Sequence, residues 1–259
     1  MLNNIKKTIN LILRDKITNA LPLAELKGKT VIITGASKGI GKATAEYLQE
    51  QGCNLILLGR KIDELKNIFP SEKFSAVKLY ELDISNFEKT KQTINSILNQ
   101  NINIDVLINN AGVNIEKPLE ESTNEDINKI IDTNIKGAIN LSANLIPHFK
   151  KNKSGTIINI GSKISHNTNV GANKVLYATS KYAIEGFSFA LNKELKGTGV
   201  RSICLMPGTV NTFVSTNAGD FMSPDRVAQV IGMIIKFDDL DFEGLVFKSK
   251  EQTIWPNQK

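Results

Sequence analysis

The sequence predicts a doubly wound α/β fold, in which helices cover both faces of a mostly parallel sheet. From residue 30 onward, short apolar runs rich in Val and Ile alternate with longer segments that carry a helical pattern. These apolar runs are continuous and do not alternate with polar residues, as expected for strands that are buried on both faces. The strand-then-helix rhythm is typical of parallel sheets built from successive crossover units.

Each expected strand is an apolar, β-branched run, and each expected helix shows apolar residues three or four positions apart. The first strand, TVIITG, ends at a glycine, and Gly52 closes the first helix as a C-terminal stop. In chain order we expect a strand at 30–35, a helix at 40–52, strands at 54–59 and 75–83 flanking a helix at 63–69, a helix through Ile94 and Leu98, a strand at 104–112, a helix at 124–149, a strand at 155–161, a helix at 175–195, a strand at 200–208, a helix at 227–235 and a strand at 243–249. No low-complexity linker interrupts this order, so residues 27–259 are predicted to form one Rossmann-type domain.

Residues 1–26 stand outside this rhythm. Five apolar side chains lie there near helical spacing, with Lys and Asn between them: Ile5, Ile9, Ile12, Leu13 and Ile17. This pattern predicts an amphipathic helix that packs on its own domain or on a sister subunit, with contact to a membrane surface as the less favoured alternative. It is a poor signal peptide, because Arg14 interrupts a very short apolar core.

Composition excludes several classes of function. The net charge is +6 and the pI is near 9.1, but six Lys and Arg against two acidic residues fall within residues 1–29, and no nucleic-acid-binding signature accompanies them. Two isolated cysteines, Cys53 and Cys204, argue against a disulfide framework and fit a reducing cytoplasm. His148 and His166 lack neighbouring ligands at metal-binding spacing, so no metal site is expected. No apolar run approaches the roughly 18 residues that a membrane span needs.

A glycine-rich turn follows the first strand directly. Gly35, Gly39 and Gly41 form a G-x-x-x-G-x-G pattern between a strand and a helix. Glycine lets the backbone turn sharply and approach a ligand, and the helix that follows offers free N–H groups to a pyrophosphate. The turn therefore predicts a dinucleotide site that also includes Ser37, Lys38 and Ile40.

The end of the second strand indicates which dinucleotide is bound. An acidic residue at this point would accept hydrogen bonds from a ribose 2′-OH, as in NAD sites. The chain instead has Arg60 and Lys61, and Lys38 lies in the nearby glycine turn. A guanidinium can bind a 2′-phosphate with two hydrogen bonds, whereas a carboxylate would repel it. We therefore expect NADP(H) to be preferred over NAD(H).

A tyrosine and a lysine lie four residues apart in a predicted helix. This spacing puts Tyr177 and Lys181 on one face of the helix, although such pairs also arise by chance. A carbonyl that accepts a hydride at carbon becomes an alkoxide, and a phenol can protonate it. Because a free phenol has a pKa near 10, a neighbouring ammonium that stabilises the phenolate would help it to release its proton.

From Lys27 to its end, the chain resembles the short-chain dehydrogenases/reductases. The family's motifs occur in order: TGASKGIG from Thr34 to Gly41, LDI with Asp83 and Ile84, NNAG with Asn110, Ala111 and Gly112, NIKG with Asn134, NIGS with Ser162, YATSK with Tyr177 and Lys181, and PGTVNT with Pro207, Gly208, Val210 and Thr212.

The resemblance implies a role for each motif. Residues 83–84 would meet the adenine, NNAG would stabilise the sheet beside the cofactor, and residues 207–212 would close over the nicotinamide. Tyr177 would be the general acid/base, and Lys181 would lower its pKa and hold the ribose. Ser162 would donate a hydrogen bond to the substrate oxygen, and Asn134 would anchor a water that relays protons from Lys181.

The serine is open to two assignments. Ser162 precedes Tyr177 by fifteen residues, about two more than is usual in the family, and Ser165 precedes it by twelve. We favour Ser162 because it directly follows the expected strand at 155–161.

The resulting functional hypothesis is an NADP(H)-dependent oxidoreductase that interconverts a carbonyl and a secondary alcohol. The pattern looks most like the 3-oxoacyl-carrier-protein reductases and related carbonyl reductases, so the substrate would be a small or carrier-tethered carbonyl. An NAD-dependent sugar or hydroxysteroid dehydrogenase and a non-catalytic cofactor-sensing protein are the alternatives. The resemblance also implies a homotetramer or a homodimer.

Overall fold

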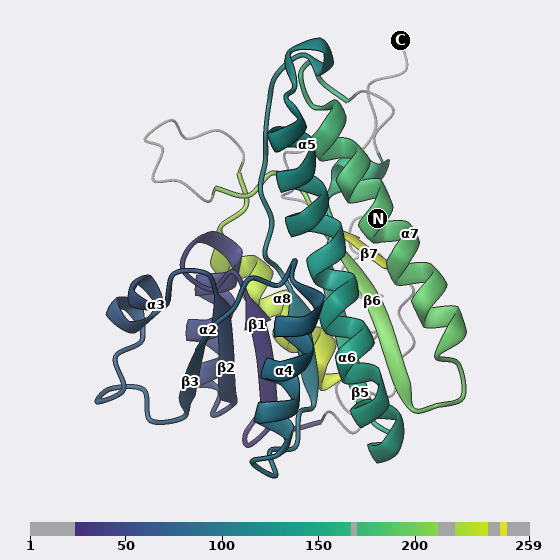
Figure 1. Cartoon of the computed structure of the whole chain (residues 1–259). Helices are drawn as coiled ribbons and strands as arrows, with labels where there is room; N and C mark the ends of the chain where they lie inside the picture. The colour runs from purple at the N-terminus through teal and green to yellow at the C-terminus, as the bar shows by residue number, and fades with distance from the viewer. Residues whose placement is uncertain (1–23, 167–169, 212–220, 238–243, 248–259) are drawn as a thin grey trace, which may run out of the picture.

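The computed structural model describes residues 24–166, 170–211, 221–237 and 244–247. It contains one sheet of seven parallel strands in the order β3-β2-β1-β4-β5-β6-β7 (Figure 1). The strands are β1 Thr30–Thr34, β2 Asn54–Gly59, β3 Val77–Glu81, β4 Val106–Asn109, β5 Gly155–Ile160, β6 Val200–Pro207 and β7 Gly244–Phe247. The doubly wound fold predicted from the sequence is confirmed.

Helices cover both faces of this sheet. The helical elements are α2 Gly39–Glu50, α3 Ile62–Ile68, α4 Phe87–Leu98, the 3-10 turn η1 Leu119–Glu121, α5 Asn124–Ile130, the π-helical turn η2 Ile131–Lys136, α6 Gly137–Asn152, the 3-10 turn η3 Lys163–His166, α7 Val175–Glu194 and α8 Pro224–Lys236. In Figure 1, α2 and α8 lie on one face and α4, α6 and α7 on the other.

Two apolar cores follow from the alternation of side chains along the strands. In β1, Val31 and Ile33 face one core with α2 and α8, while Ile32 faces the other with α4 and α6. Phe149 of α6 is fully buried in this second core. The continuous apolar runs in the sequence therefore reflect strands that are buried on both faces.

The long helix expected at 124–149 is present but is not uniform. It runs through α5, η2 and α6 and ends at Asn152, three residues beyond the expected end. A capping box between Thr123 and Asp126 fixes its start. The π-helical turn in the middle widens the backbone, a distortion that is common at functional sites.

Among the strands expected wholly within the described residues, β3 and β4 are shorter than the sequence predicts by more than one residue. β3 begins at Val77 because residues 74–77 form a turn, closed by a hydrogen bond from the Val77 N–H to the Phe74 carbonyl. β4 ends at Asn109 because the N–H of the next residue, Asn110, donates to the Thr34 hydroxyl and to the Ile108 carbonyl within β4. The 3-10 turns η1 and η3 are absent from the sequence-based prediction.

The strand order reverses between β1 and β4, where the two halves of the doubly wound sheet meet. In sheets of this type, ligands bind outside the carboxyl ends of the strands at this switch point. Beyond these ends, α5 contacts α7 (Figure 1). Most of the candidate motifs lie at or directly after the ends of β1, β2, β3, β4, β5 and β6, so the fold brings them to one edge of the sheet, whereas Asn134 lies in η2 and Tyr177 and Lys181 lie in α7.

The predicted N-terminal extension lies almost entirely outside the described residues. Of its last three residues, Leu26 is buried in the core and accepts a hydrogen bond from the Cys53 thiol, and Ala24 donates to the Lys236 carbonyl. No described helix has both the length and the apolar character needed to cross a membrane.

Candidate active site

The turn between β1 and α2 is shaped by glycine. Gly35 and Gly39 have φ angles of 69° and 55°, a region that other residues rarely enter. Gly41 packs so closely that an added Cβ would lie 2.3 Å from the Gly35 carbonyl oxygen. The Lys38 side chain does not cap α2, and the first turn of that helix contains no acidic residue. The N–H groups at the start of α2 thus favour an anion, as the glycine pattern predicts.

The NNAG segment holds this turn in place. The Asn110 side chain donates to the carbonyl oxygens of Thr34 and Gly35, at 2.9 and 3.1 Å. In return the Thr34 hydroxyl accepts from the N–H groups of Asn110 and Ala111, at 3.0 and 2.9 Å. In the sequence Thr34 is only the first residue of a motif, whereas in the structure its hydroxyl binds the segment that follows β4 to the end of β1 at the switch point.

Gly41→Ala is expected to weaken dinucleotide binding at least tenfold and to destabilise the fold by about 1–3 kcal/mol, because the new methyl group overlaps the Gly35 carbonyl and the Asn110 amide. Fluorescence titration and thermal denaturation measure both effects. Gly186→Ala is the matched control, since an added Cβ there meets no atom within 4 Å. Unchanged dinucleotide affinity in Gly41→Ala would contradict the role of the turn.

Arg60 and Lys61 follow the end of β2, and Lys38 lies in the glycine turn after β1. Two of these three cations have no partner within the described part of the chain. Arg60 and Lys38 are exposed, and no described group forms a hydrogen bond or ion pair with either side chain. Lys61 instead pairs with Glu64 at 2.8 Å. Arg60 and Lys38 are therefore available to a phosphate, whereas Lys61 is partly engaged.

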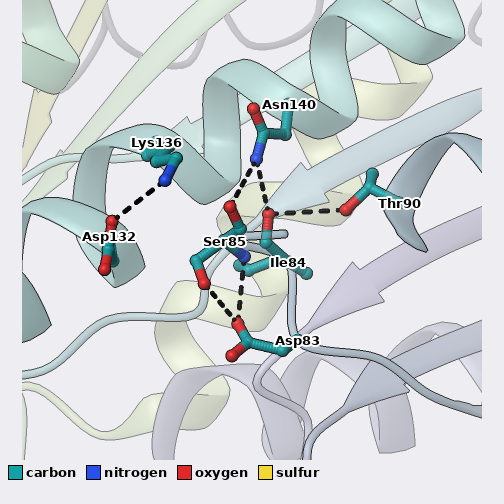
Figure 2. Close-up of polar contacts among 7 residues, drawn as sticks. All are labelled: Asp83, Ile84, Ser85, Thr90, Asp132, Lys136 and Asn140. Atoms are coloured by element: carbon teal, nitrogen blue, oxygen red, sulfur yellow. Dashed lines mark hydrogen bonds and ion pairs between the residues drawn. The ribbon is translucent and has the colours of Figure 1, made fainter. Parts of the chain in front are cut away.

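The segment after β3 is fixed by α6 (Figure 2). The Asn140 side chain donates to the carbonyl oxygens of Ile84 and Ser85, at 2.9 and 3.1 Å. Asp83 is exposed, and its carboxylate accepts from the N–H and the hydroxyl of Ser85. The buried Ile84 side chain lies where a Cβ on Gly137 would be, at 2.5 Å. This role of Asn140 is not predictable from the sequence, because an isolated asparagine within a helix gives no signal on its own.

Asn134 lies in the π-helical turn η2 and joins it to two other segments. Its side-chain amide donates to the Val113 carbonyl and to the Ser180 hydroxyl, both at 2.9 Å, and its oxygen accepts from the Val113 N–H at 2.7 Å. The residue is buried. Asn134 therefore fixes the segment after Gly112, where the chain leaves β4, against α7.

Ser162, Tyr177 and Lys181 meet beyond the end of β5. The Tyr177 hydroxyl forms a hydrogen bond with Ser162. Lys181 is buried, and its ammonium donates to the Ile160 carbonyl at 2.8 Å and lies 5.7 Å from the centre of the Tyr177 ring. The helical spacing of the pair and the strand-end position of the serine thus place all three groups together.

The titration of this group differs from the sequence-based expectation. Burial raises the pKa of Tyr177, and Glu116 adds to this effect, while the hydrogen bond from Ser162 partly lowers the pKa again. Burial also lowers the pKa of Lys181 to about 8. The expected net lowering of the tyrosine pKa is therefore not found in the protein alone, because desolvation of the phenol outweighs the favourable contacts.

Ser165 lies differently from Ser162. Its hydroxyl is buried, donates to the Ser162 carbonyl at 2.9 Å and lies 3.7 Å from the Met206 sulfur. Ser162 instead contacts Tyr177 and accepts from the Ile164 N–H at 3.3 Å. Of the two serines, Ser162 is thus the one bonded to Tyr177.

The PGTVNT segment begins at the end of β6. Pro207 is the last residue of the strand, Gly208 follows, and Val210 pairs with Met222 in an isolated bridge. Thr212 lies outside the described residues.

Both cysteines are buried, which raises the pKa of Cys53 to about 11 and that of Cys204 to about 12 and leaves each thiol neutral. Among the described residues, no group of three or more His, Cys, Asp and Glu side chains could hold a metal ion.

Comparison with known proteins decides the family. A sequence profile described as short chain dehydrogenase matches residues 29–222, which is most of the chain. The chain belongs to the short-chain dehydrogenase family. The motifs that suggested this membership are the same segments that meet at the carboxyl edge of the sheet.

Several oxidoreductases and reductases of known sequence resemble the chain. It is 32% identical to an uncharacterized oxidoreductase of Staphylococcus saprophyticus, over 81% of this chain and 91% of that protein. It is 34% identical to a 3-ketodihydrosphingosine reductase of Bacteroides thetaiotaomicron, over 74% and 68%. It is 29% identical to a 3-oxoacyl-[acyl-carrier-protein] reductase of Thermotoga maritima, over 80% and 89%. The protein is therefore an oxidoreductase of this family.

Solved structures of short-chain dehydrogenases share the fold. An alcohol dehydrogenase from the archaeon Thermococcus sibiricus, complexed with 5-hydroxy-NADP, superposes with a TM-score of 0.77 at 27% identity, over 88% of this chain and 99% of that one. A 3-ketoacyl-(acyl-carrier-protein) reductase from Brucella melitensis, complexed with NADH, gives a TM-score of 0.79 at 23% identity, over 87% and 98%. At 23% identity, the likeness to the Brucella melitensis reductase concerns the fold alone.

Proposed function

We propose that the protein is an NADP(H)-dependent oxidoreductase that interconverts a carbonyl and a secondary alcohol. The observation that carries the proposal is the cluster of Tyr177, Ser162 and Lys181 at the edge of the sheet where the glycine turn also lies. Two hydroxyl groups that hydrogen-bond to each other can both reach one substrate oxygen.

The residues around the glycine turn fit a nicotinamide dinucleotide. The cradle at Gly41 has no room for a Cβ, and the start of α2 has neither a side-chain cap nor an acidic residue. Residues 35–41 would hold the pyrophosphate, residues 83–84 the adenine, residues 110–112 the central part of the cofactor, and residues 207–212 the nicotinamide. When bound, the cofactor supplies or accepts a hydride; the other steps belong to the chain's own residues.

Tyr177 is the proposed general acid/base, and Ser162 the hydrogen-bond donor to the substrate oxygen. In reduction, the carbonyl oxygen gains negative charge, Ser162 stabilises it, and Tyr177 transfers its hydroxyl proton to it. Because burial raises the pKa of Tyr177, the phenol keeps its proton at neutral pH and is ready to act as the acid in reduction. Lys181, with a pKa of about 8, is still mostly charged at pH 7 and can stabilise the phenolate that forms.

The proton that Tyr177 gives up must be replaced from solvent. We propose that Lys181 passes it on through a water anchored by Asn134. Both amide protons of the Asn134 side chain are already used within the protein, so an oxygen of this residue would hold the water. Lys181 is also proposed to hold the ribose hydroxyls.

Arg60 and Lys38 are proposed to bind a 2′-phosphate and so to favour NADP(H) over NAD(H). Arg60→Asp is expected to weaken NADPH binding by about 10- to 100-fold and to leave NADH binding unchanged or improved, because the carboxylate repels the 2′-phosphate and can accept from a 2′-OH. Kd values for both cofactors measure this. The control is Lys61→Asp, since Lys61 is paired with Glu64 and should matter less. Equal Kd values for NADPH and NADH in the unaltered protein would contradict the proposal.

The proposed substrates are small ketones and 3-oxoacyl thioesters. The names of the relatives from Thermotoga maritima and Bacteroides thetaiotaomicron support a 3-oxo compound attached to a carrier or within a lipid. The test is a panel of ketones and acyl thioesters with NADPH, followed by product analysis. Consumption of NADPH matched by alcohol formation is expected. No consumption with any carbonyl, despite tight NADPH binding, would favour a cofactor-sensing protein instead.

The remaining proposals concern the whole chain. Residues 27–259 would form the catalytic domain of a cytoplasmic homotetramer or homodimer. Residues 1–26 would be an amphipathic extension that packs on this domain or on a sister subunit.

A further inference from the structure

Three side chains on one face of α7 contact one short segment of the chain. Tyr177, Lys181 and Glu185 follow each other at intervals of four residues, so they stack along the helix. Their partners all lie between residues 160 and 166: Tyr177 bonds to Ser162, Lys181 to the Ile160 carbonyl, and Glu185 to His166. The first two contacts belong to the proposed reaction, and the third has no assigned role.

Glu185 is an unusual residue to find at this position. Only 8% of it is exposed, although its helix lies at the surface. One carboxylate oxygen lies 2.7 Å from Nε2 of His166, and the other, Oε2, has no hydrogen-bond partner among the described residues. Burying a carboxylate with a hydrogen-bond partner for only one of its oxygens costs free energy, and the contact with His166 is the main interaction that offsets this cost. Cys204 of β6 and Lys181, one turn earlier on α7, are the other titratable groups beside it.

The segment from Ser162 to His166 is a short turn that is held to Ser162 by hydrogen bonds. The 3-10 turn η3 spans Lys163–His166 and is closed by bonds back to Ser162: the Ile164 N–H donates to the Ser162 hydroxyl, and the Ser165 hydroxyl donates to the Ser162 carbonyl. His166 is the last residue of this turn, and the residues before it are bonded to Ser162. The residues directly after His166, 167–169, lie outside the described part of the chain.

We propose that Glu185 and His166 are positioning residues, whose hydrogen bond fixes η3 on α7 and so holds the Ser162 hydroxyl against the hydroxyl of Tyr177. This inference rests on the proposed function of Ser162 and Tyr177. It explains why a carboxylate is buried two turns beyond the tyrosine. It also explains how the serine keeps its place when the loop between Ser162 and Tyr177 is longer than usual.

The effect of the Glu185 and His166 pair on Ser162 should be detectable as a change in the pKa of Tyr177. Ser162 lowers the pKa of Tyr177 against the effects of burial and of Glu116, so loosening Ser162 should raise this pKa further. One neutral hydrogen bond corresponds to about 0.5 to 1 pH unit. His166→Ala is expected to raise the midpoint of the Tyr177 titration by this amount, and Ser162→Ala to raise it at least as far.

The experiment is an ultraviolet difference titration of the folded protein, with circular dichroism as the check on folding. The chain contains four tyrosines, and Tyr177→Phe identifies the contribution of Tyr177. His166→Gln is the conservative variant, because its amide can still donate to Glu185, and it should restore the original midpoint. His148→Ala is the matched control: His148 accepts from the Ile104 N–H, far from Ser162 in the fold, and its loss should not move the midpoint.

The decisive comparison is whether the effects of His166 and Ser162 on the Tyr177 midpoint are coupled. The double variant His166→Ala/Ser162→Ala should show no greater shift than Ser162→Ala alone, because His166 acts only through Ser162. Glu185→Leu should reproduce His166→Ala; if it does not fold, the His166 variants still decide. An unchanged midpoint in His166→Ala, or additive shifts in the double variant, would overturn the proposal.

Turnover separates this proposal from the proposed function. With a reducible carbonyl and saturating NADPH, His166→Ala should lower kcat about tenfold and leave the Kd for NADPH within about twofold. If the unaltered protein reduces no carbonyl, the proposed function fails, whereas the phenol titration still tests the positioning of Ser162.

Discussion

Tyr177→Phe is expected to lower kcat for carbonyl reduction by about 10³-fold while the Kd for NADPH changes by less than about twofold. The substitution removes the only hydroxyl proposed to transfer a proton, and loss of a positioned acid costs about 10²–10⁴-fold. The ring remains, so packing at the start of α7 is kept. Steady-state kinetics and fluorescence titration measure the two quantities.

The control for this variant lies on the same helix. Tyr182 is 47% exposed, and Tyr182→Phe should leave kcat unchanged. The pH profile adds a second check. Burial lowers the pKa of Lys181 to about 8 and raises that of Tyr177, so the ammonium loses its charge first and reduction should begin to decline near pH 8. Substantial turnover by Tyr177→Phe would show that another group supplies the proton.

Lys181→Met is expected to lower kcat/KM by about 10²–10³-fold without lowering the melting temperature. The ammonium is the buried cation beside Tyr177, and its loss removes the electrostatic stabilisation of the developing phenolate. Stability should not fall, because folding lowers the pKa of Lys181 from 10.5 to about 8. The charged amine is thus disfavoured in the folded state at every pH below about 10, and the apolar methionine removes this cost.

Lys150→Met, on the exposed side of α6, is the matched control and should change neither activity nor cofactor binding. A loss of activity in Lys181→Met that is matched by a lower melting temperature would point to a structural role. Full activity would rule out the proposed effect of the ammonium on Tyr177.

Much of this arrangement could be predicted from the sequence. The β-branched runs predict strands buried on both faces, and the structure shows such strands with their side chains divided between two cores. Because the carboxyl ends of parallel strands share one edge, motifs that directly follow β1, β4 and β5 had to meet. Gly41 and the Tyr177 and Lys181 pair follow from local rules of backbone geometry and helical spacing.

Several features that could not be predicted from the sequence depend on contacts between distant segments. Asn140 reaches Ile84 across 56 positions, and Thr34 reaches Asn110 across 76, so no local pattern marks either residue. The pKa of Tyr177 depends on how much water the folded protein removes from the phenol, which spacing does not reveal. The π-helical turn at Asn134 likewise arises in a sequence that reads as an uninterrupted helix.

Transfer of deuterium from NADPH to a carbonyl tests the proposed activity most directly. NADPH labelled at the transferring position of the nicotinamide is incubated with a ketone or a 3-oxoacyl thioester, and the alcohol product is analysed by mass spectrometry and NMR. We predict one deuterium at the carbinol carbon for each NADPH consumed, and labelling that is about 10³-fold slower with Tyr177→Phe. Tight binding of NADPH with no labelled alcohol from any carbonyl, or equal labelling by Tyr177→Phe, would contradict a Tyr177-dependent carbonyl reductase.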